Sequence, residues 1–232
     1  MSNIENIKKS IKKLFIGEYS GDFLKKKLGP LSILVFAGFM GISWILFPNY
    51  NWTQMDISNL GHPELNPLGW IFWSIGLTLT GIIMLSITGY IKRRLIPIFN
   101  IHAKIGTFFY YLSAIGMIFL GLIPQFEGDI FKILHYMFAG FAFGGLYLGT
   151  WTFCIHMLKD EEFKRKARVM TVLAFGPSMG LALTQSIRLL VSFPNNQIPW
   201  IIEFSLWEWL LLFGIFGAFV FLLFNLPKNE KE

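Results

Sequence analysis

The sequence predicts an all-α fold, a polytopic bundle of six transmembrane helices with both termini in the cytoplasm. Six apolar stretches run along the chain, each about as long as the roughly 20 residues that a bilayer crossing requires. A hydrophobic content of 54% and a mean hydropathy of +0.54 are too high for an ordinary soluble domain. The lysines and arginines gather in alternate connections between these stretches, as they do in multi-pass membrane proteins.

The predicted spans divide the chain into three parts. A basic leader covers residues 1–27, a six-helix transmembrane domain covers 28–226, and a short tail covers 227–232. The spans are Pro30–Phe47, Leu68–Tyr90, His102–Ile123, His135–Leu158, Val169–Ser192 and Ser205–Asn225.

The charges predict the orientation and the class of partner. The connections at 48–67, 124–134 and 193–204 contain only one basic residue, Lys132, so these connections are predicted to lie outside. The same rule accounts for the net charge of +6, so we do not expect a nucleic-acid partner. The single cysteine, Cys154, excludes an internal disulfide and a cysteine metal cluster.

The leader has a helical pattern of its own. Ile4, Ile7, Ile11 and Leu14 recur at helical spacing with lysines between them. This pattern is typical of an amphipathic helix on the inner leaflet, with its lysines near anionic headgroups. The alternative is a disordered basic tail that only fixes the topology.

Small residues and a proline predict how the helices pack. Gly140, Gly144, Gly145 and Gly149 form small-xxx-small pairs on the fourth helix, which let helices approach closely, and two copies of the chain could associate through the Gly140/Gly144 face. Gly176-Pro177 predicts a kink in the fifth helix, because proline removes a backbone donor. No matching break occurs in the first three helices, so a transporter is only weakly indicated.

Polar side chains from four segments are predicted at the outer membrane level. We expect a binding site there, formed by the first outer connection, the second outer connection with the adjoining start of the fourth helix, the fifth helix, and the outer start of the sixth. The candidates are Asp56, Ser58, His62, Glu127, His135, Gln185, Arg188 and Glu203.

Arg188 is the most unusual of these residues. A charge at the centre of a membrane helix costs about 2.5–3.5 kcal/mol, so it usually faces the protein and finds an anionic partner. Asp56, Glu127 and Glu203 are the candidate partners. Its guanidinium is suited to a phosphate or carboxylate, although a structural ion pair or snorkelling toward the headgroups would explain it equally.

His135 and Asp56 are the candidate catalytic pair. His135 is a candidate base and Asp56 could orient it, while His62 could contribute a second imidazole. No spacing in the chain is diagnostic of a metal site, so no metal is assigned, and no cofactor is identified. His102 and His156 are expected to have an interface role at the cytoplasmic ends of the third and fourth helices.

Several other polar residues have structural interpretations. Asn66-Pro67 is typical of an N-cap followed by proline at the first helical position. Ser205 and Glu208 have the spacing of a capping box. Six tryptophans near the predicted outer helix ends suggest an aromatic belt: Trp52, Trp70, Trp73, Trp200, Trp207 and Trp209.

Three short motifs carry a resemblance to a known family. They are Asp56-Ile-Ser58-Asn-Leu60-Gly61 after the first helix, Gly121-x-x-Pro124 closing the third, and His135 soon afterward. In these the chain resembles the prokaryotic six-helix family called domain of unknown function nine-nine-eight, which is similar in layout to the eukaryotic FRAG/DRAM/SFK group. The resemblance covers roughly residues 30–225 and implies the architecture and a site location rather than a reaction. Gln125 stands where the family pattern leads us to expect an acidic residue.

Two classes of function follow. The first is a membrane protein whose outer-leaflet pocket binds a lipid or another anionic amphiphile, and a small transporter is a variant of it. The second is an integral-membrane hydrolase or acyl transferase in which His135 acts as base, Asp56 orients it and Arg188 holds the headgroup. The chain offers no obvious nucleophile, since Ser58 is the only motif serine nearby.

Overall fold

A computed structural model describes residues 5, 18–126, 128–191, 199, 201 and 203–226 of the chain. Within these residues the structure consists of helices and connecting loops, without a strand, so the all-helical prediction is confirmed. The amphipathic leader predicted from Ile4 to Leu14 lies outside the described residues, and so does Glu127.

Five helical segments are long and apolar enough to cross a membrane, which supports a membrane protein. They are Gly21–Leu46, Gly69–Leu122, Asp129–Met157, Lys164–Leu190 and Phe204–Phe224. The first joins α2 (Gly21–Phe23), the π-helix η1 (Leu24–Leu28) and α3 (Gly29–Leu46), and the third joins α5 (Asp129–Ala139), the π-helix η3 (Gly140–Gly144) and α6 (Gly145–Met157). The others are α4 (Gly69–Leu122), α7 (Lys164–Leu190) and α8 (Phe204–Phe224), and a 3-10 helix, η2 (Ile57–Gly61), lies between α3 and α4.

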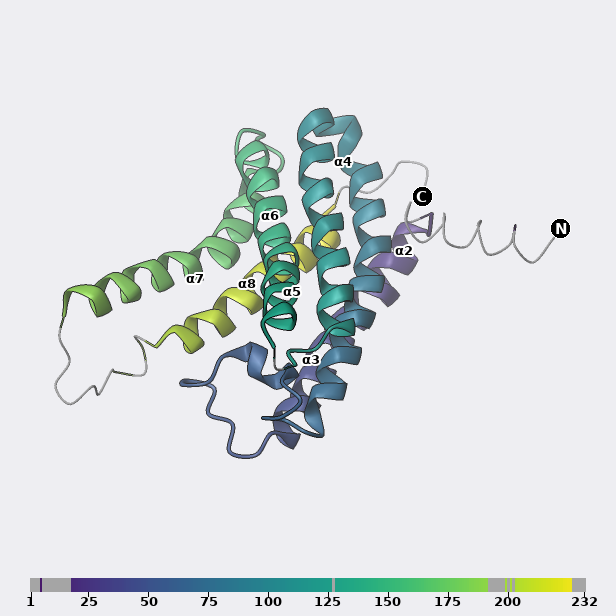
Figure 1. Ribbon diagram of the computed structural model, residues 1–232. Coiled ribbons are helices and arrows are strands. Elements are labelled where there is room, and N and C mark those ends of the chain that lie inside the picture. The colour runs from purple at the N-terminus through teal and green to yellow at the C-terminus, as the bar shows by residue number, and fades with distance from the viewer. Residues whose placement is uncertain are drawn as a thin grey trace.

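The second segment, α4, contains the predicted second and third spans. Its backbone leaves helical geometry at Asn100, where φ is 38°. The two halves then run side by side in opposite directions, as Figure 1 shows. Small residues allow this close approach: a Cβ on Gly81 would lie 2.6 Å from the carbonyl oxygen of Ala114, and one on Gly121 would lie 2.5 Å from that of Ser74.

The segment from α5 to α6 packs against the second half of α4. A Cβ on Gly145 would meet the Phe109 carbonyl oxygen at 2.6 Å, and one on Gly116 would meet the backbone nitrogen of Ala142 at 2.5 Å. The predicted pair Gly140 and Gly144 has no atom within 4 Å of either added Cβ. Of the four predicted glycines, Gly145 and Gly149 therefore pack against the second half of α4, whereas Gly140 and Gly144 do not.

The first and last helices also lie side by side. The Phe36 and Phe216 rings are 4.6 Å apart. Near the chain ends, Lys25 Nζ donates a hydrogen bond of 2.9 Å to the carbonyl oxygen of Leu226. The start of the first long helix and the end of the last are thus at one end of the bundle.

The last two helices pack through the predicted Gly176-Pro177 region. α7 runs as one helix through Pro177, which cannot donate to the Leu173 carbonyl. Gly214 of α8 packs against this carbonyl oxygen, and the ring of Pro177 lies beside it. The proline therefore serves the α7–α8 contact.

Most helix boundaries follow the predictions within a few residues, but the predicted connection 91–101 is helical except at Asn100, α7 begins five residues early, and α5 begins six residues early. It starts at Asp129, directly after Gly128, whose φ of 119° suits glycine. The acidic side chain in the first turn is favourable beside the positive end of the helix dipole. His135 consequently lies in the second turn of the helix instead of at its start.

Candidate functional site

The loop between α3 and α4 is fixed by one buried side chain, Asn66. Its Nδ2 lies within hydrogen-bond distance of three acceptors, the Ser43 carbonyl (3.1 Å), Ser43 Oγ (3.0 Å) and the Leu60 carbonyl (2.9 Å). Its Oδ1 accepts from the Gly69 N–H at 3.1 Å. The residue at the N-cap position is Leu68, not Asn66 as predicted, but Asn66 still accepts from the first turn. Asn66 thus connects the end of α3, η2 and the start of α4.

A tyrosine fixes the preceding part of the loop. Tyr50 Oη donates to the carbonyl oxygens of Met55 (3.0 Å) and Asp56 (3.1 Å) and accepts from Trp209 Nε1 (3.2 Å). Burial raises the pKa of Tyr50 well above its usual value, so its hydroxyl keeps its proton. The contact with Trp209 brings the Asp56 backbone against α8.

Two further bonds attach Asp56 and Ile57 to α8. Ser205 Oγ donates to Asp56 Oδ1 at 2.9 Å, and the Ile57 N–H donates to Glu208 Oε2 at 2.8 Å. The capping-box prediction for Ser205 and Glu208 is therefore wrong. α8 starts at Phe204 with Glu203 at its N-cap, so Ser205 lies inside the helix, and both side chains bond the loop about 150 positions earlier in the chain.

These contacts enclose a polar cavity of about 440 Å³ among η2, α4, α5, η3 and α8. Its size lies in the range of about 300–1,000 Å³ that is usual for ligand pockets. The lining includes three of the predicted site residues, Asp56, Ser58 and His135. The other lining residues are Ile57, Asn59, Trp73, Leu120, Gln125, Tyr136, Ala139, Phe143, Phe204 and Glu208.

Two buried polar atoms in this lining lack a hydrogen-bond partner within the described residues. They are Nδ1 of His135, a residue only 5% exposed, and Oε1 of Gln125. A buried polar atom without a partner costs about 1–3 kcal/mol, so each favours a bound water or ligand. From the sequence, Gln125 was counted among the polar residues of the second outer connection and noted as a departure from a family pattern, but it was not chosen as a site residue.

Glu208 is the lining residue that sequence reasoning missed. Its spacing from Ser205 has a local explanation, and nothing in the sequence shows that its carboxylate reaches the loop before α4. Each carboxylate, Asp56 and Glu208, uses one oxygen in its bond to the other segment, which leaves the second oxygen as an acceptor. No lysine or arginine lines the cavity.

A π-helix adjoins the cavity. His135, Ala139 and Phe143 follow at intervals of four residues and all line it, and Phe143 belongs to η3. Single π-turns inside α-helices are frequent at functional sites. This turn changes the register between α5 and α6, so His135 lines the cavity while Gly145 packs on α4.

Two residues that line the cavity, one on α5 and one on α8, are also exposed at the surface of the bundle. Tyr136 of α5 is 68% exposed and Phe204 of α8 is 43% exposed, and both line the cavity. Both helices belong to segments that are apolar enough to cross a membrane.

Four other predicted site residues lie outside this cavity, and Glu127 is not among the described residues. Arg188 Nη1 is 3.8 Å from Glu203 Oε2, and the Arg188 side chain is 42% exposed. Nδ1 of His62 accepts a long bond of 3.3 Å from the Glu64 N–H. Gln185 lies on α7 and, like these three, is not part of the lining.

Two tryptophans of the predicted aromatic belt also have a different role. Trp73 and Trp209 are buried; Trp73 lines the cavity and Trp209 donates to Tyr50. These two side chains pack against protein, since a position near a helix end does not show which side of the helix faces the protein.

The remaining histidines lie side by side. The rings of His102 and His156 stack with centroids 3.2 Å apart, and His156 Nδ1 lies 2.9 Å from the Thr152 carbonyl oxygen. Within the described part of the chain, no group of three His, Cys, Asp or Glu side chains is placed to hold a metal ion.

Comparisons with known proteins leave the cavity as the main guide to function. No family, no curated protein and no solved structure matches the chain.

Proposed function

We propose that this protein crosses the membrane six times, with both termini in the cytoplasm, and that its polar cavity binds the headgroup of a lipid-like amphiphile from the outer leaflet. The observation that carries the proposal is the pair of unpartnered buried atoms, His135 Nδ1 and Gln125 Oε1, in a cavity whose lining includes side chains exposed at the surface of the bundle.

The proposed topology rests on α4 and on the charges. The parts of α4 before and after Asn100 are each long enough to cross the membrane. With α4 counted as two crossings, the five apolar segments make six crossings in total. An even number of crossings agrees with the Lys25–Leu226 bond between the first and last helices. It also matches the layout of the six-helix family that the motifs resemble, and we propose membership of that family.

The charges in the cavity favour a particular headgroup. Asp56, Glu208 and Gln125 supply acceptors, and no lysine or arginine is present. An anionic headgroup would meet two carboxyl groups there, and Arg188 lies elsewhere with Glu203 as its neighbour. We therefore infer a headgroup that donates hydrogen bonds, such as an ammonium or a polyhydroxyl group, instead of the anion expected from Arg188.

Cysteine labelling tests the topology. A cysteine at Glu64 is expected to react with an impermeant thiol reagent from outside intact cells, and one at Glu162 only after permeabilisation. Native Cys154 is buried and gives little background. Labelling of Glu162→Cys from outside would overturn the orientation.

Lipid binding tests the function. The purified protein in nanodiscs would be compared by native mass spectrometry with phosphatidylethanolamine, a glycolipid and phosphatidic acid. We expect phosphatidylethanolamine or the glycolipid to be retained more strongly than phosphatidic acid. The double variant His135→Phe, Gln125→Leu should retain that lipid about tenfold less, because it loses two hydrogen bonds to the headgroup.

Arg188→Ala is the matched control for this measurement. It removes a charge at the same predicted membrane level but outside the cavity, so headgroup retention should be unchanged. Preferential retention of phosphatidic acid that disappears in Arg188→Ala would instead support the anionic ligand.

A lipid-modifying enzyme is the second candidate. Asp56, Glu208 and His135 line one cavity and include both acids and a base, the groups that general acid–base catalysis uses. Product formation from the retained lipid, abolished by His135→Ala while retention persists, would establish catalysis. Retention without product over a broad lipid panel would favour binding alone.

A further inference from the structure

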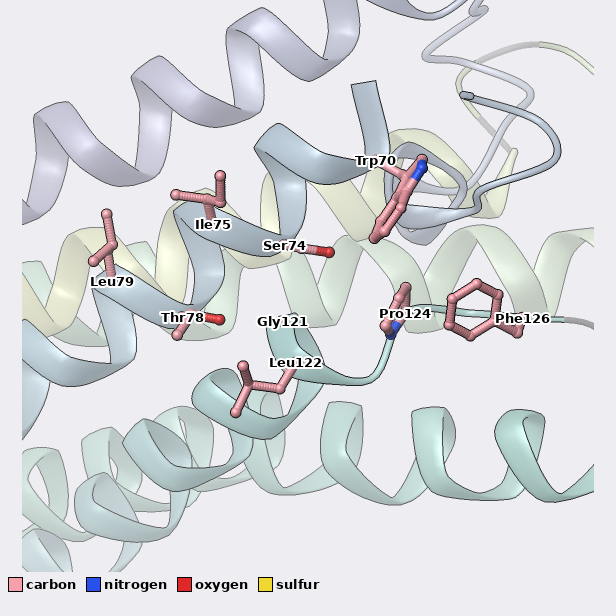
Figure 2. Close-up of a pocket in the computed structure, with 9 residues that line it drawn as sticks. All are labelled: Trp70, Ser74, Ile75, Thr78, Leu79, Gly121, Leu122, Pro124 and Phe126. Atoms are coloured by element: carbon pink, nitrogen blue, oxygen red, sulfur yellow. The ribbon is translucent and has the colours of Figure 1, made fainter. Parts of the chain in front are cut away.

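A second hollow lies on the lipid-facing side of α4, separate from the polar cavity. It is a groove of about 450 Å³ between the first half of α4 and the end of the second half. Figure 2 shows the residues that line it: Trp70, Ser74, Ile75, Thr78, Leu79, Gly121, Leu122, Pro124 and Phe126. We call it the α4 groove.

The α4 groove and the polar cavity share a wall. Leu120 and Gln125 line the cavity, whereas their neighbours Gly121 and Phe126 line the groove. The segment 120–126 therefore separates the two hollows.

The α4 groove opens toward the bilayer. Leu122 is 61% exposed, and Ile75 and Leu79 are exposed as well, although all belong to an apolar segment long enough to cross the membrane. In a membrane such side chains contact lipid tails. The surrounding lipid is consequently the molecule with direct access to the groove.

One polar atom in the groove lacks a partner. Ser74 Oγ is buried and makes no hydrogen bond within the described residues. Figure 2 shows the Ser74 and Thr78 hydroxyls on the same side of α4, facing the segment that carries Gly121 and Pro124. A hydroxyl that faces an apolar groove favours an occupant with a hydrogen-bond acceptor at that depth.

The depth of Ser74 in the membrane indicates which hydrogen-bond acceptor its hydroxyl meets. Trp70 and Phe126 pack edge to face at one end of the groove, with centroids 6.2 Å apart, and tryptophan is typical of the headgroup level. Ser74 lies one turn further along the helix, about 6 Å deeper. This is the level just below the headgroups, where an acyl chain joins the glycerol through its ester.

We propose that the α4 groove binds one acyl chain of a glycerolipid, with the ester carbonyl accepting a hydrogen bond from Ser74 Oγ and the chain lying along Leu79 and Leu122. Gly121 forms the floor, because a Cβ there would lie against Thr78 Oγ1. The occupant is distinguished from bulk lipid by this bond and by the enclosing aromatic pair.

The experiment compares an ester lipid with its ether analogue. Native mass spectrometry of the protein in nanodiscs would measure binding of diacyl and dialkyl phosphatidylglycerol, which differ in the carbonyl. Wild-type protein is expected to prefer the diacyl lipid about two- to tenfold, the range that one hydrogen bond supports. Ser74→Ala should bring this ratio to one. A wild-type ratio of one would overturn the bond to Ser74.

A second variant tests the groove without touching its interior bonds. Leu79→Trp should fill the groove from the lipid side and abolish the preferential binding, whereas Ile45→Trp, at an 85% exposed position on α3, should leave it unchanged. Diacyl preference that survives in folded Leu79→Trp protein would overturn the site. The double variant His135→Phe, Gln125→Leu tests whether the preference arises in the α4 groove or in the polar cavity. This variant should still prefer the diacyl lipid. Loss of the preference in this variant would show that the preference arises in the polar cavity.

Discussion

α4 and α7 are both apolar enough to cross the membrane, yet the protein uses them differently. In α4, 61% of the most apolar stretch is buried inside the protein, compared with 22% in α7. Gly116 of α4 is in contact with the backbone of the next segment, whereas Gly176 of α7 has no atom within 4 Å of an added Cβ. Hydropathy alone therefore identifies a crossing helix but does not show how much of it packs against protein.

Their polar residues differ in the same way. On α7, the hydroxyls of Ser178, Thr184 and Ser186 bond carbonyls three or four residues earlier in the same helix. On α4, Ser113 donates to the Ala142 carbonyl and Tyr110 bonds Thr150. Just before α4, Asn66 donates to the Ser43 and Leu60 carbonyls, so all three bond partners from other segments. Local bonds satisfy a hydroxyl without placing one helix against another, while the long-range bonds determine the tertiary arrangement.

Replacing a packed glycine should have the largest effect. In Gly116→Leu, the new side chain would overlap the Ala142 backbone, so we expect destabilisation of about 3 kcal/mol or more. Gly176→Leu on α7 is the control and should fold normally, because the position is open. Thermal unfolding of the detergent-purified proteins, followed by size-exclusion chromatography, measures both. Equal melting temperatures for the two variants would contradict the idea that α4 packs more tightly against protein than α7 does.

Removing Asn66 should come next. Asn66→Ala removes the amide that donates to the buried Leu60 carbonyl and to Ser43. Because several hydrogen bonds are lost together, we expect the free energy of unfolding to fall by about 2–4 kcal/mol. Ser178→Ala on α7 loses only a bond within its own helix and should cost less than about 0.5 kcal/mol. The same unfolding measurement applies, and a cost for Ser178→Ala as large as for Asn66→Ala would refute the contrast.

Ser205 should have an intermediate effect. Ser205→Ala removes the bond to Asp56 across the loop–α8 contact, so we expect a loss of about 1.5–3 kcal/mol, the range for hydrogen bonds to charged groups. Ser186→Ala on α7 is the matched control, with a bond only to Ala182. If Ser205 merely capped its own helix, the double mutant Asp56→Ala, Ser205→Ala would show additive losses instead of coupling.

Arg188 should have the smallest effect on stability. Its pair with Glu203 has a 3.8 Å separation and a 42% exposed side chain, so solvent screens most of the interaction. We expect Arg188→Ala to change the free energy of unfolding by less than about 0.5 kcal/mol. Unfolding in low and high salt checks this, and a strong salt-dependent loss would show that the pair is tighter than its geometry indicates.

Part of the candidate site follows from the sequence. Asp56, Ser58 and His135 were predicted to lie together because each is polar and each was assigned to the same end of the bundle, and all three line the cavity. Glu208 was assigned to a local cap, because its spacing from Ser205 explains it without any tertiary contact. Arg188 shares the predicted level but lies on the less buried helix, and level alone does not bring side chains together.

The sequence by itself determined that the chain is helical and belongs in a membrane, since length, hydropathy and charge distribution are properties of each segment alone. It also determined where Pro177 would remove a backbone donor. Only the tertiary structure decided that the turn between the predicted second and third spans lies at Asn100, that Gly145 packs on α4 and Gly144 does not, and that Glu208 and Gln125 join His135 in one cavity. These outcomes depend on the rotation and register of one helix against another. That register is set by the close packing of many side chains at once, which no periodicity within a single segment records.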